Sequence, residues 1–191
     1  MKRLRNLINH LQSTERLIRQ LNTSNHADAL SALTVLKERQ ALQDGTLRDT
    51  DISGANLSSA TFAKSVLERV NFSHAQLINT YFYEAQLQHA CLMSANLTGA
   101  NLRLAQMQGA SLAGANLSST NMARADLSQA DLQQANLQNA NLWQVNLVGA
   151  NLTGANVTGA NFTDAVCNQH TILPDGSPWS DDVDWSVYTD G

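Results

Sequence analysis

The sequence predicts a mainly β repeat fold, and three features of one long segment predict it. Every fifth residue from Leu47 to Phe162 is apolar, which makes 24 apolar centres in 24 consecutive units. Alanine stands two positions before the centre in 17 of the 24 units, and Asn or Asp stands one position before it in 15. Seven of the ten glycines stand two positions after a centre. The unit therefore reads Ala-(Asn/Asp)-Leu-x-x from Gly45 to Asp164.

A period of five excludes both simple regular structures. On an α-helix, successive centres would lie about 140° apart around the axis, so no apolar stripe would form. On one long strand, an odd period would turn every second centre towards water. The pattern fits a short extended piece followed by a corner, in which Ala and Leu point inward and Asn or Asp points outward. The glycines then lie in the corner, where the backbone can need a positive φ.

The unit resembles that of the pentapeptide-repeat family, as in the five residues from Ala95 to Gly99. The resemblance covers about 120 of the 191 residues. It implies a right-handed quadrilateral parallel β-helix with four units per coil. The repeat would then form about six coils, with a partial seventh through Cys167 and Ile172. At about 4.8 Å per coil, the stacked coils would be about 29 Å long.

Residues 1–44 break the period and predict an N-terminal helical segment. A first helix is predicted by apolar residues that share one face: Leu4, Leu7, Ile8, Leu11, Ile18 and Leu21. Asn25 and Asp28 resemble an N-cap box for a second helix from about Ala27 to Gln43, which Asp44-Gly45 would end. Because a solenoid with bare ends would associate edge to edge, we expect this segment to cap the first coil.

The basic residues of the first predicted helix leave two roles for it. It packs beside the second helix, or it binds a partner. An anionic surface would also suit its basic residues, although such a run is more often a solvated face. These residues are Lys2, Arg3, Arg5, Arg16 and Arg19.

The C-terminal residues also leave the period. Leu173 to Gly176, with the sequence Leu-Pro-Asp-Gly, is typical of a turn. We expect the aromatic residues that follow, Trp179, Trp185 and Tyr188, to close the last coil; a flexible acidic peptide is the alternative. Members of the family often end in a comparable segment. The chain thus divides into three segments: residues 1–44, the β-helix 45–165 and the tail 166–191.

The sequence holds no pattern typical of catalysis or of metal binding. Its five histidines and two cysteines form no metal-ligand spacing, and it has no Ser/His/Asp set and no phosphate-binding loop. Cys91 and Cys167 would lie about four coils apart, too far for a disulfide, so both thiols should be free. We therefore expect no enzyme activity, no cofactor and no metal.

Four units per coil sort the outward residues into columns on four sides. Side four is defined by six centres: Phe62, Phe82, Leu102, Met122, Leu142 and Phe162. Its outward residues include the aromatic and arginine side chains that contribute most to interface energies. They form the predicted contact face: Lys64, Tyr81, Tyr83, Glu84, Arg103, Leu104, Arg124 and Trp143. The alternative is that the N-terminal helices or the tail pack on this side.

These features predict a non-catalytic protein–protein interaction scaffold with an unidentified protein partner. The family resemblance implies an alternative, DNA mimicry, in which the protein binds DNA gyrase in place of duplex. Duplex carries about one negative charge per 1.7 Å, so a shaft of this length should present roughly 17. Residues 45–164 hold seven acidic and five basic residues, a net charge of −2, which disfavours mimicry.

The overall charge of the chain and the lengths of its apolar runs limit which other partners are expected. The net charge of −4 and the pI of about 5.6 disfavour nucleic acid as a partner. No run reaches the roughly 18 apolar residues of a membrane span. Because Asn9, His10 and Gln12 interrupt any signal-peptide core, we expect a cytoplasmic protein with no membrane partner. We expect a monomer; a dimer through the last coil, as in some relatives, is the alternative.

Overall fold

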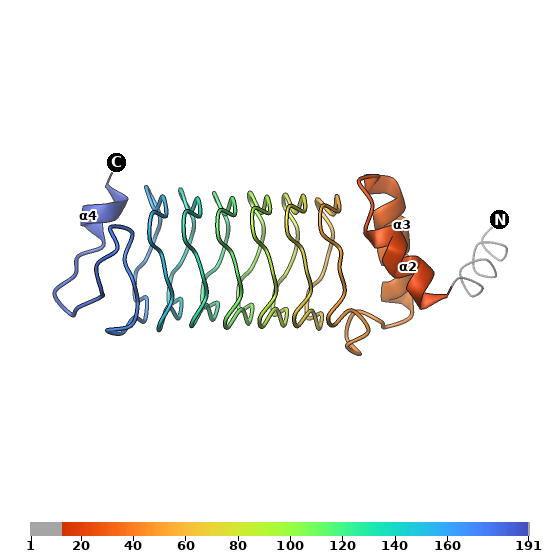
Figure 1. The fold of residues 1–191 in the computed structure, drawn as a ribbon, viewed down its shortest axis with the longest axis horizontal. Helices are drawn as coiled ribbons and strands as arrows, with labels where there is room; N and C mark the ends of the chain where they lie inside the picture. The colour runs from red at the N-terminus through yellow and green to blue at the C-terminus, as the bar shows by residue number, and fades with distance from the viewer. Residues whose placement is uncertain (1–12, 191) are drawn as a thin grey trace.

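The repeat winds into coils that stack along one long axis, with the N-terminal helices at one end and the tail at the other (Figure 1). The computed structural model describes residues 13–190. Parallel bridges join residues 20 positions apart, from Asp51–Asn71 to Asn146–Val166. A bridge occurs at every fifth residue, so each turn of 20 residues has four paired sides. This register agrees with the expected four units per coil.

The sides of the coil pair through single residues rather than through extended strands. In residues 13–190 the pairings are isolated bridges, and no strand is formed. The reason lies in the short unit: the residue before each centre makes the bridge, and the two residues after the centre already form the next corner. Parallel β pairing therefore holds, without strands. The right-handed sense and the count of about six coils stay predictions.

The corners of the coil have left-handed backbone. All 24 residues that lie two positions after a centre, from Asp49 to Asp164, have positive φ. Seven are glycine, as the corner prediction requires, but 17 carry side chains, such as Leu104 with a φ of 61°. Each such residue costs about 1–2 kcal/mol relative to right-handed backbone. Hydrogen bonds between coils offset this cost, because the corner N–H donates to a carbonyl one coil further along the chain. The N–H of Leu104, for example, donates to Ala123 O at 3.1 Å.

The interior is filled by the centres and by the alanines two positions before them. Every centre from Leu47 to Leu152 is fully buried. Near the N-terminal end, the rings of Phe62 and Phe82 stack with centroids 5.3 Å apart. Phe72 meets both rings edge-on, at 5.9 and 5.8 Å. Such aromatic pairs add about 0.5–1.5 kcal/mol beyond the burial of their area.

The outward Asn and Asp residues hydrogen-bond the backbone of the corner that follows them. Asn141 Oδ1 accepts the N–H of Trp143 at 3.2 Å, and Asn101 Oδ1 accepts the N–H of Arg103 at 3.1 Å. Some also bond between coils, as when Asn161 Nδ2 donates to Asn141 Oδ1 at 3.3 Å. The predicted inward and outward faces of the unit are confirmed by these contacts and by the burial of the centres.

Helix α2 (Thr14–Leu21) begins later than the sequence predicts. Ser13 is extended, with φ −68° and ψ 150°, and its hydroxyl accepts the N–H of Arg16 at 3.2 Å. Ser13 is therefore an N-cap, and the prediction of one helix over Leu4–Leu21 is wrong at this point. The rest of that prediction falls on residues 1–12, outside the described residues.

Helix α3 (His26–Glu38) begins at the predicted N-cap, since Asn25 Oδ1 accepts the N–H of Ala27 at 3.1 Å. It ends before the predicted limit near Gln43. Gln40 takes a left-handed φ of 61°, and the chain then turns into the first coil. No helix within residues 13–190 is long and apolar enough to cross a membrane.

The N-terminal segment supplies hydrogen bonds that a preceding coil would otherwise supply. The carbonyl of Thr23 accepts the N–H of Asn56 at 3.2 Å, and the carbonyl of Leu42 accepts the N–H of Val66 at 2.7 Å. Leu36 of α3 is fully buried in the same apolar cluster as the first centres. These contacts satisfy the edge of the first coil.

One extra residue shifts the register at the C-terminal end. Asn151 pairs with Ile172, a step of 21 residues rather than 20. The predicted partial seventh coil through Cys167 and Ile172 is therefore shifted by one residue: Ile172 makes the bridge, and Leu173, only 1% exposed, points inward. The hydroxyl of Thr171 donates to Leu147 O at 2.8 Å within the widened corner.

The tail covers the end of the last coil with the predicted aromatic residues. Trp185 stacks on Phe162 with ring centroids 3.8 Å apart and an interplanar angle of 5°. Trp179 and Tyr188 lie 5.6 and 6.2 Å from Trp185. The short helix α4 (Ser186–Thr189) follows, and its last carbonyl accepts the N–H of Gly159 at 2.7 Å.

Candidate functional site

The predicted contact face on side four contains a chain of contacts that crosses three coils. Lys64 Nζ lies 3.4 Å from Glu84 Oε2. A hydrogen bond with Tyr83 lowers the pKa of the Glu84 carboxyl, and the same bond raises the pKa of the Tyr83 hydroxyl. The Arg103 guanidinium lies 5.9 Å from the centre of the Tyr83 ring, within cation–π range. These four side chains therefore hold one another in place.

The backbone ladder fixes the relative positions of the residues on this face. Each coil adds about 4.8 Å, so Lys64 and Trp143 are about 19 Å apart along the axis. The corner N–H groups donate to carbonyls one coil further on: Lys64 to Tyr83 (2.8 Å), Glu84 to Arg103 (3.1 Å), Leu104 to Ala123 (3.1 Å) and Arg124 to Trp143 (2.8 Å). A partner would thus meet a surface that is already ordered.

Two aromatic side chains of side four are open to solvent. Tyr81 is 54% exposed and Trp143 is 37% exposed. Leu104 is half-buried, in the corner beside Arg103. Ala123, between Arg103 and Trp143 in one column, is only 4% exposed. The result is a strip of mixed aromatic, aliphatic and cationic groups.

The helices and the tail lie at opposite ends of the coil (Figure 1). Helices α2 and α3 adjoin the first coil. The tail reaches side four at the last coil, where Phe162, Trp185 and their neighbours line a shallow crevice of 370 Å³. Trp143, one coil before Phe162, stays 37% exposed. The expected alternative, that the N-terminal helices or the tail pack over the contact face, stays a prediction.

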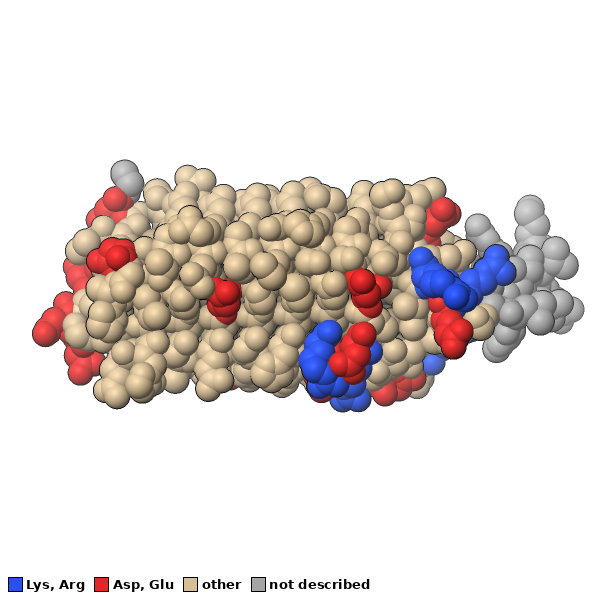
Figure 2. All heavy atoms as spheres, viewed as in Figure 1, with Lys and Arg blue, Asp and Glu red and all other residues tan. Residues whose placement is uncertain are grey.

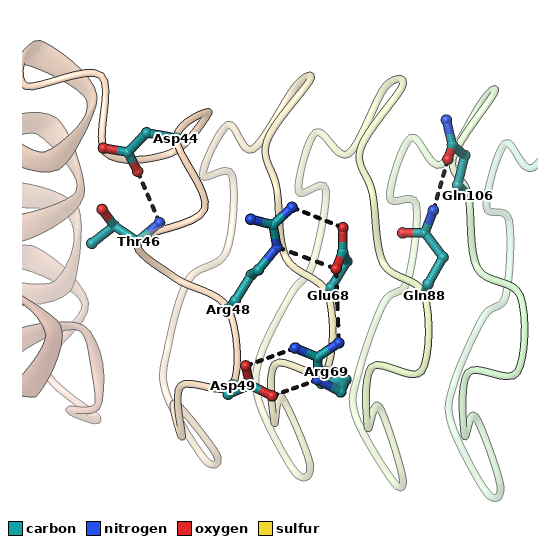
Figure 3. Close-up of polar contacts among 8 residues, drawn as sticks. All are labelled: Asp44, Thr46, Arg48, Asp49, Glu68, Arg69, Gln88 and Gln106. Carbon is teal, nitrogen blue, oxygen red and sulfur yellow. Dashed lines mark hydrogen bonds and ion pairs between the residues drawn. The ribbon is translucent and has the colours of Figure 1, made fainter.

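A second polar cluster lies on side one, the side whose centres begin with Leu47 and Leu67 (Figure 3). Arg48 Nη2 donates to Glu68 Oε1 at 3.0 Å, and Arg69 Nη2 donates to Asp49 Oδ2 at 2.8 Å. The hydrogen bond from Arg69 lowers the pKa of the Asp49 carboxyl, and the bond from Arg48 lowers the pKa of the Glu68 carboxyl.

The spacing of charges in the sequence contains a signal for this cluster. The residues of each pair are opposite in charge and 20 positions apart, which is the length of one coil. The cluster ties the first two coils together. Because all four charges of this cluster already have partners, the cluster has fewer charged groups for a bound molecule than side four has.

The repeat also matches a known family. The family model described as Pentapeptide repeats matches in eight copies, in five overlapping segments: residues 46–82, 63–99, 90–129, 100–139 and 130–166. These matches span well over half of the chain. The chain belongs to the pentapeptide-repeat family. No curated protein matches it.

Solved structures of other pentapeptide-repeat proteins are similar to this chain. HetL, involved in heterocyst differentiation regulation in the cyanobacterium Nostoc sp. PCC 7120, is 26% identical, with 70% of this chain and 89% of that chain covered and a TM-score of 0.43. Rfr23 from the cyanobacterium Cyanothece 51142 is 25% identical, with 72% and 99% covered and a TM-score of 0.40. Full-length QnrB1, a plasmid-mediated fluoroquinolone resistance protein, is 17% identical, with 69% and 87% covered and a TM-score of 0.41.

The cysteines of this pentapeptide-repeat protein are both free, as predicted. Cys167 takes the place of a centre in the last part of the coil, and burial raises the pKa of its thiol to about 11. This thiol therefore stays protonated at neutral pH and is a poor nucleophile. Within residues 13–190, no group of three or more His, Cys, Asp and Glu residues is placed to hold a metal ion.

Proposed function

We propose that this pentapeptide-repeat protein is a non-catalytic protein-binding scaffold and that side four is its contact face. The observation that supports the proposal is the exposure of Tyr81 and Trp143 on a rigid backbone ladder, beside Arg103 and Arg124. Aromatic and arginine side chains dominate the energy of protein interfaces. A surface that is already ordered loses little conformational entropy when it binds.

The ends of the chain fit the same proposal. Residues 1–44 act as the N-terminal cap of the coil and residues 166–191 as its C-terminal cap. Because Trp185 covers Phe162, the last coil presents less apolar surface to a second copy. The protein then binds its partner as a monomer. Sedimentation that detects a stable dimer would contradict this role of the tail.

DNA mimicry remains the alternative function, and the distribution of charge supports it less well. Figure 2 shows few acidic residues along the visible face of the coil and more at its two ends. Asp49, Glu68 and Glu84 each contact a lysine or an arginine, so their charges are locally compensated. A stoichiometric amount of the protein should therefore leave gyrase supercoiling unchanged. A response in that assay would favour mimicry.

The test of the proposed function is a comparative pull-down from the native cell lysate. The baits are the wild type and a Tyr83→Ser/Trp143→Ser variant, both first shown to be folded by circular dichroism. A matched control, Ile78→Ser/Gln138→Ser, changes the equivalent corner positions of the same coils on side three, the side of Leu77 and Leu137. The wild type and the control should capture a protein that the side-four variant loses. If all three baits recover the same proteins, or none, side four is not the contact face.

A further inference from the structure

We infer that the partner meets side four with a net-acidic peptide segment that carries an aromatic or large aliphatic side chain. The inference rests on the proposed function and specifies the chemistry of the partner. It follows from the charge, the apolar groups and the length of the strip between Lys64 and Trp143.

The charge of this strip is opposite to that of the whole chain. Lys64, Arg103 and Arg124 stand against Glu84, a net charge of +2, whereas the chain has a net charge of −4. Glu84 already contacts Lys64 and Tyr83. Within residues 13–190, no carboxylate lies within ion-pair distance of Arg103 or Arg124. Two carboxylates of a partner would form ion pairs with these two arginines.

Apolar groups lie among the same arginines. Leu104 follows Arg103 directly in the chain, and the backbone carbonyl of Trp143 accepts the backbone N–H of Arg124 at 2.8 Å, which places these two residues on adjacent coils. Ala123, between Arg103 and Trp143 in one column, adds no bulk. One segment can therefore place an apolar side chain against Trp143 or Leu104 while its carboxylates reach the arginines.

The length of the strip sets the length of the segment. About 19 Å along the axis corresponds to about 13 residues of α-helix or about six residues of extended chain. A peptide of about 12 residues therefore almost spans the strip as a helix, about 18 Å, and more than spans it as an extended chain.

An acidic peptide suits this surface better than a single-stranded nucleic acid does. Nucleic-acid affinity depends on many phosphate contacts, each to a separate cation. Side four offers two cations for such contacts, Arg103 and Arg124, because Lys64 already contacts Glu84. Two cations are few for binding a polyanion.

The inference is tested by selection from a random dodecapeptide library displayed on phage, with the full chain as bait. Counter-selection uses an Arg103→Ser/Arg124→Ser/Trp143→Ser variant whose fold is checked by circular dichroism. The peptides retained only by the wild type should have a net charge of −2 or lower and an aromatic or large aliphatic residue. Retained peptides that are neutral or basic would overturn the inference, and so would a selection with no preference for the wild type.

The best selected peptide, labelled with fluorescein, is then titrated against single variants by fluorescence anisotropy. Trp143→Ala should weaken binding about tenfold or more, and Arg124→Ser about threefold or more. Gln138→Ala, at the equivalent corner on side three, should leave the affinity unchanged. Raising the salt concentration from 50 to 300 mM should weaken binding, because opposite charges are screened. A 12-nucleotide uridine RNA that binds side four more tightly than the peptide would replace the inference with a nucleic-acid partner.

The two experiments separate the inference from the function on which it rests. If the pull-down depends on Tyr83 and Trp143 but the selected peptides are not acidic, the scaffold proposal stands and the acidic partner is wrong. If the pull-down does not depend on these residues and no peptide is selected, both are wrong.

Discussion

Ser65 and Thr120 stand at the same position of their units, two residues before a centre, where most units have alanine. Both are buried. The Thr120 hydroxyl donates to Leu117 O at 2.7 Å, whereas the Ser65 hydroxyl has no hydrogen-bond partner. A buried hydroxyl without a partner costs about 1–3 kcal/mol, and a satisfied one contributes about 1 kcal/mol. The same substitution should therefore have opposite effects at the two sites.

Ser65→Ala should raise the free energy of unfolding by about 1 kcal/mol, because it removes an unsatisfied polar group. Thr120→Ala should lower it by about 1 kcal/mol or more, because it removes a hydrogen bond and a packed methyl group. Both values are measured by urea denaturation. Two changes of the same sign would show that the Ser65 hydroxyl is satisfied in solution.

Gly54 tests the left-handed corner without side-chain crowding. Its φ is 66°, and a Cβ atom built on it would have no heavy atom within 4 Å. Gly54→Ala should lower the free energy of unfolding by about 1 kcal/mol, since only the backbone conformation is disfavoured. Gln133→Ala, at an exposed residue just before the corner of another unit and without positive φ, is the control and should change it by less than about 0.5 kcal/mol. Equal effects at residues 54 and 133 would argue against corner strain.

At the scale of the coil and its caps, Trp185 tests whether the tail stabilises the last coil. Trp185→Ala should lower the free energy of unfolding by about 2 kcal/mol, from the lost burial of the indole and the lost stack on Phe162. The amide protons near Phe162 should also exchange faster with solvent. Val187→Ala, in the same short helix at a residue that is 75% exposed, should do neither. A Trp185 variant as stable as the wild type would mean that the tail does not act as a cap.

The side-one cluster predicts how acid affects the first two coils. The pKa values of Asp49 and Glu68 are lowered below 3.8 and 4.5 by the arginines that bond them. A lowered pKa stabilises the fold above the unfolded-state value, and this contribution is lost as the pH falls through the folded-state value. The melting temperature of the wild type should therefore fall more between about pH 5 and pH 3 than that of an Arg48→Ser/Arg69→Ser variant.

The control for this pH effect is Arg124→Ser, which removes an arginine that has no carboxylate within ion-pair distance in residues 13–190. Its melting temperature should fall with pH as that of the wild type does. Parallel pH profiles for all three proteins would mean that the pairs in Figure 3 contribute nothing measurable in solution.

Across the whole molecule, each coil contacts its neighbours only, so damage at one end should stay local. The stability of such a solenoid is approximately a sum over repeats and their interfaces. Leu36→Ala, in the buried face of α3, should increase amide exchange at Asn56 and Val66, whose N–H groups bond the N-terminal segment. Exchange at Leu147, near the other end, should not change. A uniform increase along the coil would show that the solenoid unfolds as one cooperative unit.

Much of the coil follows from the sequence, because its contacts repeat with the chain itself. The centre of each unit, the outward Asn or Asp and the left-handed corner are all positions in a period of five, so the sequence shows which residues are buried. The same pattern did not reveal that pairing is limited to single bridges, nor that 17 of the corners would be left-handed without glycine. Those outcomes depend on how tightly the coil turns.

The ends of the chain were predicted less well, because no repeat specifies them. Ser13 interrupts the expected first helix, and Gln40 ends the second one early, through local hydrogen bonds and backbone angles that an apolar pattern does not show. The one-residue shift that turns Leu173 inward in place of Ile172 likewise depends on the bonds of Thr171 within the corner. Local hydrogen bonds therefore decide where the helices begin and end, and contacts with the preceding coil decide the register of the last residues.

The sequence was sufficient for the family, the repeat register and the composition of side four, since each is a property of spacing along the chain. Only the tertiary structure decided that Tyr81 and Trp143 stay exposed. It alone also showed that Glu84 is engaged by Lys64 and Tyr83 while Arg103 and Arg124 contact no carboxylate in residues 13–190. The physical reason is that exposure and charge pairing depend on which side chains meet across coils and where the caps lie. These are distances in space, and a one-dimensional period does not contain them.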